Sequence, residues 1–442
     1  MSGAIVGCSS DSDTTDVATS NNCAITSFVL GGIPCVMHTT TDDGRDSTYE
    51  AVLTGANYPL SIDQLNNRIY LNDSLPVGSD ISRITFSSVN HTGVSMAIRS
   101  IVTAQDTIFN TADSTDCSLP RLFTVFASDG SSRSYTLELR VHKQSGDEMD
   151  WKQVATADEV AALQELKVLA VEGTLYVFGR RDGACELITS TDQGATWQRQ
   201  SVSADLATRS VHYLQGTFVG LSRAGEVLVS TDAQTWNARS GQTFTALFVG
   251  SDAYYGLADA QIWSSQDLNT WKQDALSTTD ALPVAQWDAV VLPSRTNSHY
   301  EDLILAGLDA DAKPALWHRT IDTEGNYNFA WNKLQTSTTH NYPILQSTSL
   351  LAYDDAPVVI GLPEENPSPE LYISRDRGRT WLNTEIALPE AASATAIGAT
   401  VDADNHLWVI CGGTGQIWRG RLARLAWKKT TTQFYRAPKR GK

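Results

Sequence analysis

The stretch "STDQGATW" at residues 190–197 returns as "SRDRGRTW" at residues 374–381, with Ser, Asp, Gly, Thr and Trp at the same spacing. The Asp carboxylate of such an octapeptide can accept hydrogen bonds from the backbone amides of its own turn. The Gly can take the positive φ that a tight corner often requires, and the Trp can bury its large ring between neighbouring layers. The pattern therefore predicts a structural corner that a repeating fold needs in each copy, and not a catalytic signature.

Two shortened copies of the octapeptide, "STDAQTW" at 230–236 and "SQDLNTW" at 265–271, keep Ser, Asp, Thr and Trp but lack the Gly. We expect all four copies to form corners. The corner residues are Ser190, Asp192, Gly194, Thr196, Trp197, Asp232, Trp236, Asp267, Trp271, Ser374, Asp376, Gly378, Thr380 and Trp381.

The corners belong to a longer repeat. From residue 150 onward, six β-patterned runs such as "FVGLSRAG" and "LWVICGGTG" each end in a Gly-rich or polar turn and lead into another short strand. A Trp then opens the next strand. A four-stranded unit that recurs every 40–50 residues or so is typical of a β-propeller, and six copies predict a six-bladed β-propeller over 150–442. The opening tryptophans are Trp197, Trp236, Trp271, Trp331, Trp381 and Trp427.

One strand is left over from this count. The segment "DWKQVA" at 150–155 carries Trp151 and has the look of another outermost strand. Either it completes the sixth blade, or "LAWKK" at 425–429 does so alone and the first strand is an extra edge. We expect a closure in which both ends of the domain take part.

The residues before the propeller have a different pattern. Residues 1–20 are polar and are expected to form a disordered tether, whereas 21–145 alternate apolar and polar positions. In "LFTVFASDGSSRSYTLELRVHK", Phe123 and Val125 alternate with polar neighbours before a turn, and Tyr135 resumes the alternation after it. This predicts a hairpin with one buried face and a β-sandwich domain over 21–145. The fold class is therefore all-β.

Composition excludes some functions. A formal net charge of −17 argues against a nucleic-acid partner, and no run of about 20 apolar residues could span a membrane. Phosphate-loop and dinucleotide fingerprints are absent, as is any zinc-type Cys or His spacing, so no cofactor and no metal is expected. Any two of Cys23, Cys35 and Cys117 could form a disulfide, and Cys185 and Cys411 are expected to be small buried hydrophobes.

The N-terminal sequence "AIVGCSSDSD" places Ile, Val and Gly directly before Cys8, an order that resembles a bacterial lipobox. The Ser and Asp residues behind it resemble the surface-export signal of Bacteroidetes lipoproteins. The resemblance implies lipidation of Cys8 and a place on the outer membrane at the cell surface, with the membrane reached only through this anchor. Few residues precede Cys8, so the leader would be trimmed or its start placed late; the alternative is a free Cys in a disordered tail.

The octapeptide itself is similar to the Asp-box, or BNR repeat, found in sialidases, some glucan hydrolases, sortilin-like receptors and plant assembly factors. As a whole the chain resembles a family of Bacteroides surface lipoproteins that place a cadherin-like or immunoglobulin-like sandwich before an Asp-box propeller. The segment "QIWRGRLARLAWKK" at 416–429 resembles the closing segment of that family. The family has no settled activity, so the resemblance implies an architecture and no mechanism.

Two classes of function stay open. A sialidase-like glycoside hydrolase would show a Phe/Tyr-Arg-Ile-Pro motif and paired acids, but the motif is absent. The adjacent pairs Asp354–Asp355 and Glu364–Glu365 would point to opposite faces of a strand. We therefore predict a monomeric, non-catalytic binding or scaffold protein that presents propeller loops to a surface glycan or protein, with the hydrolase as the alternative and no catalytic residue assigned.

The candidate binding residues come from long loops, which often carry function. The loops at 179–184, 293–302 and 362–370 are expected around the mouth of the central channel, and Arg181, His299 and Tyr300 are the candidates for a glycan or peptide site. The remaining arginines at strand ends are expected to form surface ion pairs. These are Arg180, Arg209, Arg223, Arg319 and Arg377.

Overall fold

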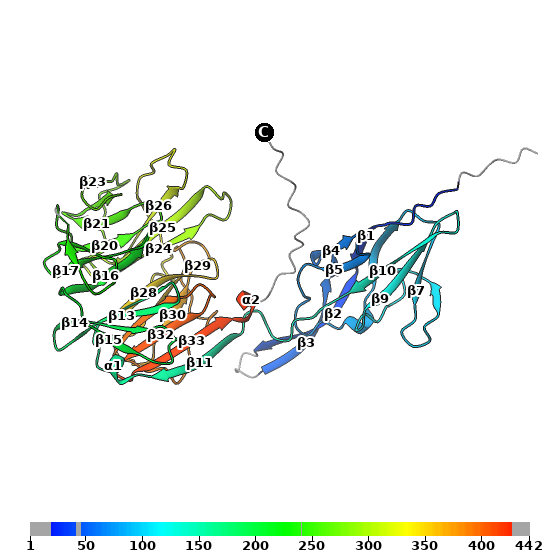
Figure 1. Ribbon diagram of the computed structural model, residues 1–442, viewed down its shortest axis with the longest axis horizontal. Coiled ribbons are helices and arrows are strands. Elements are labelled where there is room, and N and C mark those ends of the chain that lie inside the picture. Colours follow the sequence, from blue (N-terminus) through cyan, green and yellow to red (C-terminus); the bar gives the residue numbers. More distant parts are fainter. Residues whose placement is uncertain (1–18, 41–45, 240, 427–442) are drawn as a thin grey trace, which may run out of the picture. The chain divides into compact units, whose positions relative to one another are not determined.

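The structure is a computed structural model that describes residues 19–40, 46–239 and 241–426 (Figure 1). It folds as two compact units, one ending at Gly146 and the other spanning Asp147–Ala426. Strands dominate both units, as the all-β prediction requires. Cys8 and Trp427 lie outside the described residues.

The N-terminal unit is a sandwich of β-sheets. Its largest sheet has the order β4 (Leu60–Asp63), β5 (Arg68–Leu71), β10 (Ser132–Glu138), β9 (Arg121–Phe126), β7 (Ser95–Arg99) and β8 (Asp106–Ile108). Against it, β1 (Ile25–Leu30) pairs with β6 (Phe86–His91), and β2 (Gly32–Thr40) pairs with β3 (Asp46–Thr54). The rings of Phe28 on β1 and Phe123 on β9 meet edge to face at 5.1 Å, which joins the two layers through a buried aromatic core.

The hairpin predicted in this unit is present. β9 and β10 pair antiparallel, with Tyr135 opposite Phe123. Phe123, Val125 and Tyr135 are all fully buried, so the alternating pattern did identify the face that packs on the core.

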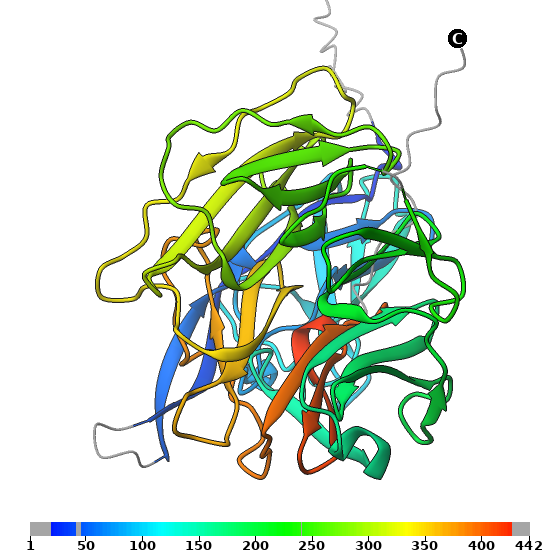
Figure 2. The same cartoon turned by 90° about the vertical axis from the view of Figure 1, so that its left-hand side faces the viewer.

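The second unit is a six-bladed β-propeller whose sheets surround a common centre (Figure 2). Its first three blades are β12 (Leu166–Val171), β13 (Thr174–Arg181), β14 (Ala184–Ser190), β15 (Gln198–Gln200); β16 (Leu206–Leu214), β17 (Thr217–Ser222), β18 (Val227–Ser230), β19 (Asn237–Ala238); and β20 (Ala246–Val249), β21 (Tyr254–Ala258), β22 (Gln261–Ser265), β23 (Lys272–Gln273).

The last three blades complete the ring. They are β24 (Ala285–Pro293), β25 (Tyr300–Leu308), β26 (Pro314–Asp322), β27 (Asn332–Lys333); β28 (Gln346–Tyr353), β29 (Ala356–Leu362), β30 (Glu370–Ile373); and β31 (Ala396–Val401), β32 (Leu407–Gly412), β33 (Gln416–Leu422), β11 (Met149–Thr156). Short helical turns, α1 (Asp158–Ala161) and α2 (Ala423–Ala426), follow β11 and β33. The fifth blade has three strands instead of the expected four, because the chain after Trp381 makes only a single bridge, between Ile373 and Leu382.

The strand left over in the sequence completes the sixth blade. β11 pairs antiparallel with β33, and Trp151 lies opposite Gly420. A Cβ at Gly420 would come within 2.4 Å of the Trp151 ring, so this position needs the space that only glycine leaves. Both ends of the domain therefore share one sheet, and the strand around Trp151 supplies its outer edge.

The octapeptides form the tight corners that their residues predict, directly after the third strand of a blade. At residues 190–197, the backbone N–H and the hydroxyl of Thr196 donate to the carboxylate of Asp192 at 2.9 and 2.6 Å, and Gly194 N–H donates to the Ser190 hydroxyl at 2.9 Å. The Trp197 indole N–H donates to the carbonyl of Gly194. The second copy repeats these bonds around Asp376.

The shortened copies reach the same corner with one residue fewer. Each full copy has two consecutive residues with positive φ, Gln193 and Gly194 in the first, whereas the shortened copies have one, Ala233 or Leu268. The shortened copies thus lack the left-handed position that Gly occupies in the full copies. Their single left-handed position is occupied by a non-Gly residue, at φ 65° in Ala233 and 62° in Leu268.

None of the five cysteines in the described residues forms a disulfide. Cys411 is fully buried in a strand, as expected, and Cys185 is half-buried. Cys35 and Cys117 are buried free thiols, so the sandwich is held by its apolar core.

Candidate functional site

The turns of each blade alternate between two faces of the propeller, because each blade is an antiparallel meander. We call the face where the innermost strands begin the start face, and the face where they finish the end face. Arg181, at the β13–β14 turn, lies on the start face, whereas His299 and Tyr300, at the β24–β25 turn, lie on the end face. The structure therefore does not bring the three predicted binding residues together.

Arg181 is engaged within its own blade region. Its guanidinium lies 3.4 Å from the carboxylate of Glu186 and donates to the carbonyl of Glu159 in α1 at 2.7 Å. These bonds hold α1 against the first blade.

Tyr300 belongs to an exposed aromatic patch, which we define as Tyr300, Tyr327 and Phe329. Phe329 meets Tyr300 edge-on at 5.9 Å, and the Tyr327 and Phe329 rings lie 6.1 Å apart with planes only 34° apart. Tyr327 is 64% exposed and Phe329 37%. Tyr300 thus packs against the side of Phe329. The rings of Tyr327 and Phe329 form the outer, exposed part of the patch.

The loop that carries the patch is fixed by local bonds. The carboxylate of Asp322 accepts from the backbone N–H groups of Glu324 and Tyr327 at 3.0 and 2.9 Å. Beside the rings, His299 Nδ1 lies 2.9 Å from Glu324 Oε1. Polar side chains therefore border a preformed aromatic surface. The alternation in "NYNFAW" at 326–331 was the signal in the sequence that could have identified Tyr327 and Phe329.

A second candidate site lies on the axis of the propeller. We call it the axial cluster and define it as Lys167, Arg209, His212, Asp288 and Tyr342. Lys167 on the innermost strand of the first blade binds Asp288 on that of the fourth, with Nζ 3.1 and 3.2 Å from the two carboxylate oxygens. In a ring of six, these blades are opposite each other, so this ion pair spans the channel.

Asp288 is 2% exposed and also accepts from the backbone N–H of Leu350 at 3.1 Å. Burial pushes the pKa of this carboxyl up, but Lys167 and the other positive and hydrogen-bonding groups around it outweigh burial and lower the pKa. Asp288 is therefore an anion held in place, and it is not an acid with a proton to give.

Arg209 reaches across the axis from the second blade. Its guanidinium donates to the carbonyls of Trp287 and Thr348, both at 3.2 Å, and to the side-chain oxygen of Gln286 at 2.9 Å. Within the described part of the chain it forms no ion pair with a carboxylate. Burial lowers its pKa from the ordinary arginine value, with partial compensation from Asp288. Arg209 is a channel cation whose direct partners are all neutral.

Two polar atoms of the cluster have no hydrogen-bond partner among the described residues. His212 is 7% exposed and its Nε2 is unpaired; Tyr342 is 2% exposed and its hydroxyl is unpaired. Burial, followed by the charge of Lys167, lowers the pKa of His212 to about 3, so the ring is neutral. Burial and the charge of Asp288 raise the pKa of Tyr342. Unpaired buried polar groups are rare and costly in native proteins.

Irregular backbone places these side chains. The innermost strands of blades two, four and five each carry a bulge, between Ala207 and His212, between Ala285 and Asp288, and between Gln346 and Ser349. Gln286 and Ser347 take φ 49° within theirs. Bulges re-aim side chains and are frequent beside functional sites. Sequence patterns do not reveal them, and the axial cluster was not predicted.

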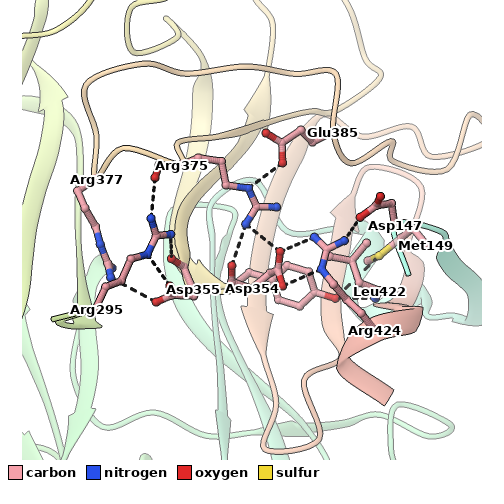
Figure 3. A network of polar contacts seen from close by, with 11 residues as sticks. Asp147, Met149, Arg295, Asp354, Asp355, Arg375, Arg377, Glu385, Leu422 and Arg424 are labelled. Carbon is pink, nitrogen blue, oxygen red and sulfur yellow. Dashed lines mark hydrogen bonds and ion pairs between the residues drawn. The ribbon is translucent and has the colours of Figure 1, made fainter. Parts of the chain in front are cut away.

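The proposed acid pair Asp354–Asp355 has a different use (Figure 3). Asp354 is bound by Arg375 at 2.8 Å and by Arg424, and Asp355 by Arg295 at 2.6 Å and Arg377 at 3.3 Å. Burial raises the pKa of Asp354, but Arg424 and Arg375 together outweigh it and lower the pKa. Each carboxylate is thus an ion-pair partner of two guanidinium groups. Glu364 and Glu365 are exposed in the β29–β30 connection.

Not all the strand-end arginines are on the surface as predicted. Arg180 and Arg319 are buried and bind Asp205 and Asp274, and Arg209 lies in the channel. The expectation of surface ion pairs is wrong for these three, because Arg180 and Arg319 bind carboxylates of the segments that link neighbouring blades, and Arg209 reaches across the axis. Arg223 is exposed, and Arg377 joins the network of Figure 3.

Searching the described residues gives no group of three His, Cys, Asp or Glu side chains that could hold a metal ion. Their helices are also too short or too polar for any of them to cross a membrane.

The fold and these two sites define a β-propeller protein, an architecture that suggests a binding or scaffold role. The chain belongs to the DUF6242 family: residues 145–430 match the DUF6242 beta propeller domain, and residues 28–139 match the N-terminal domain of unknown function of the same family. No curated protein matches the chain.

Among solved structures, the chain is similar to a structural genomics protein of unknown function from Bacteroides thetaiotaomicron, with 9% identity, a TM-score of 0.41, and 83% of this chain and 98% of that one covered. It is also similar to a Trichoderma reesei protein of carbohydrate-active enzyme family AA12 (11%, 0.40, 62% and 96%). A third is a family 117 glycoside hydrolase of the marine bacterium Zobellia galactanivorans (11%, 0.30, 62% and 90%).

Proposed function

We propose that this protein is a non-catalytic, monomeric binding protein of the bacterial cell surface, and that it holds a glycan on the aromatic patch. The observation that carries the proposal is the exposed pair of neighbouring rings at Tyr327 and Phe329, 6.1 Å apart and tilted by 34°. Contiguous exposed apolar surface marks an interaction site. A sugar ring presents C–H groups that pack on such a platform, and its hydroxyls meet bordering polar groups such as His299 and Glu324.

The cellular setting is part of the proposal. The lipobox-like order before Cys8 supports a lipid anchor, and the octapeptide corners support the comparison with Asp-box propellers. The anchored chain would carry the propeller outward from the outer membrane of a Bacteroidetes bacterium. No cofactor, metal or nucleic acid takes part.

Binding is favoured over hydrolysis by the state of the carboxylates. A glycosidase uses two carboxyl groups that flank the scissile bond, one of them able to donate a proton. Asp354 and Asp355 are each bound by two arginines, and Asp288 is bound by Lys167 across the axis. The platform, by contrast, is exposed and preformed.

The test is retention of the full chain on a broad glycan array beside the double variant Tyr327→Ala/Phe329→Ala. We expect the wild type to be retained and the variant to lose at least about tenfold in affinity, since stacked aromatic contacts dominate such interfaces. Tyr49→Ala is the matched control, because Tyr49 is a similarly exposed aromatic residue of the other unit, at 51%. It should bind as the wild type does.

Two outcomes would contradict the proposal. If the wild type is retained on no glycan, the partner is a protein, and capture from an outer-membrane extract becomes the next experiment. If the double variant is retained as well as the wild type, glycan binding takes place elsewhere on the molecule. Release of free sugar from a retained glycan would instead support the hydrolase alternative.

A further inference from the structure

We propose that the axial cluster is a second binding site, for a small hydroxy-carboxylic acid: the carboxylate binds at Arg209 and the Tyr342 hydroxyl, and the ligand hydroxyl donates to His212. The site is separate from the aromatic patch, so the proposal does not rest on glycan binding. It is carried by three observations on the described residues, which are a channel cation without a carboxylate partner, two unpaired buried polar atoms, and a nearby cavity.

The first observation is the charge of the cluster. Lys167 binds Asp288 directly at 3.1 Å, whereas the guanidinium of Arg209 forms no ion pair within the described residues and feels the carboxylates of Asp288 and Glu165 only from a longer distance. Its hydrogen bonds go to two carbonyls, one hydroxyl and one amide oxygen. Keeping a guanidinium in a low-dielectric channel without a directly bound counter-ion is costly. A bound carboxylate would give Arg209 the direct ion pair that the described residues do not supply.

The second observation gives the chemistry of the unpaired atoms. The ring of His212 donates to the backbone carbonyl of Leu247, and Nε2 is the ring nitrogen without a partner. The donor is therefore Nδ1, and in the neutral ring Nε2 keeps a lone pair that can only accept. The Tyr342 hydroxyl can donate. One acceptor and one donor fit a ligand that carries both a hydroxyl and an anion.

The third observation is space. A cavity of about 410 Å³ lies among the innermost strands toward the end face; its lining includes Ala289, Val290, Leu350 and Leu351 and none of the five cluster residues. Ala289 follows Asp288 in the chain, and the backbone N–H of Leu350 binds the Asp288 carboxylate. Since most of the lining is aliphatic, the body of the ligand should be apolar, with its polar end toward the cluster.

The experiment measures thermal unfolding of the full chain with a panel of hydroxy acids from lactate to 2-hydroxy-4-methylpentanoate and mandelate. A ligand that binds only the folded state raises the unfolding midpoint. We expect 2-hydroxy-4-methylpentanoate to raise it by several degrees. The matched compounds 4-methylpentanoate, which lacks the hydroxyl, and 2-hydroxy-4-methylpentanamide, which lacks the charge, should each bind at least about tenfold more weakly.

Tyr342→Phe is the decisive variant. Because the Tyr342 hydroxyl has no partner in the part of the chain that the structure describes, its removal should leave the midpoint without ligand unchanged or higher, while affinity for the hydroxy acid falls about tenfold. Tyr353→Phe is the control: the Tyr353 hydroxyl is also buried but accepts from the backbone N–H of Leu422 at 2.9 Å. That variant should lower the midpoint and leave the affinity unchanged.

Arg209→Gln should abolish binding of the hydroxy acid altogether. If this variant fails to fold, the comparison of Tyr342→Phe with Tyr353→Phe still tests the proposed site. The proposal is overturned if no member of the panel raises the midpoint of the wild type. It is equally overturned if Tyr342→Phe binds the hydroxy acid as tightly as the wild type does, or if the amide binds as tightly as the acid.

Discussion

The corner at 190–197 and the axial cluster use the same kinds of polar group in opposite ways. Asp192 is at the surface, yet both its carboxylate oxygens accept hydrogen bonds from Thr196. His212 and Tyr342 are buried, yet each has a polar atom without a partner in the described part of the chain. The polar groups of the corner at 190–197 satisfy one another. Buried groups left unpaired lower stability, and in the proposed axial site a ligand would complete the bonds of His212 and Tyr342.

The largest expected effect comes from breaking the ion pair across the axis. Asp288→Ala leaves the Lys167 charge buried without a partner and should lower the free energy of unfolding by about 3–5 kcal/mol. The double variant Lys167→Met/Asp288→Leu removes both charges and should recover much of that loss. Urea unfolding measures both. A loss below about 1 kcal/mol in the single variant would show that solvent reaches the pair freely.

Substitutions at the left-handed positions of two corners should change the free energy of unfolding by a smaller amount, and in opposite directions. Gly194→Ala introduces a Cβ at φ 79° that would come within 2.8 Å of the Trp408 ring, and should cost about 1–3 kcal/mol. Ala233→Gly in a shortened corner relieves an alanine at φ 65° and should stabilise by about 0.5–1 kcal/mol. Urea unfolding of both variants should therefore move the midpoint in opposite directions; a shift in the same direction would contradict the account of the shortened copies.

The smallest effect is a dependence on acid pH. The Thr196 hydroxyl and backbone N–H hold the pKa of Asp192 at about 2, below its ordinary 3.8. A lowered pKa stabilises the fold above the unfolded value, and that stabilisation is lost as the pH falls from about 4 toward 2. Asp192→Asn should therefore flatten the decline of the thermal midpoint over this range. An unchanged slope would mean that the corner carboxylate contributes nothing to acid stability.

The corners and the blades could be predicted because their signals are local. Ser190, Asp192 and Gly194 contact one another within a few residues of chain, and spacing alone reveals such contacts. The β9–β10 hairpin is local in the same way. Lys167 and Asp288 are 121 residues apart and meet only when the ring closes, and the bulge that aims Asp288 has no sequence signature of its own.

The residues of the candidate glycan site were predicted only in part for a related reason. Loop length pointed to His299 and Tyr300, which the structure places in or beside the aromatic patch. It could not show which face each loop occupies, so Arg181 was grouped with residues of the opposite face. Tyr327 and Phe329 were missed because their loop was not among the long loops singled out in the sequence. The residue types at Arg181, His299 and Tyr300 do not show which of them lie together; only their positions in the folded propeller do.

The closure of the ring by β11 also decides how the domain would respond to a pull. Tension along the chain that precedes the propeller arrives first at Asp147, whose carboxylate is bound by Arg424 of α2, which in turn binds Asp354 of the fifth blade (Figure 3). Only after these ion pairs does the force act on Met149 and on the hydrogen bonds between β11 and β33. Without the ion pairs, those hydrogen bonds would break one at a time from the end of the strand. The ion pairs of Arg424 with Asp147 and Asp354 therefore transfer load to the fifth blade before the β11–β33 pairing that closes the ring is broken.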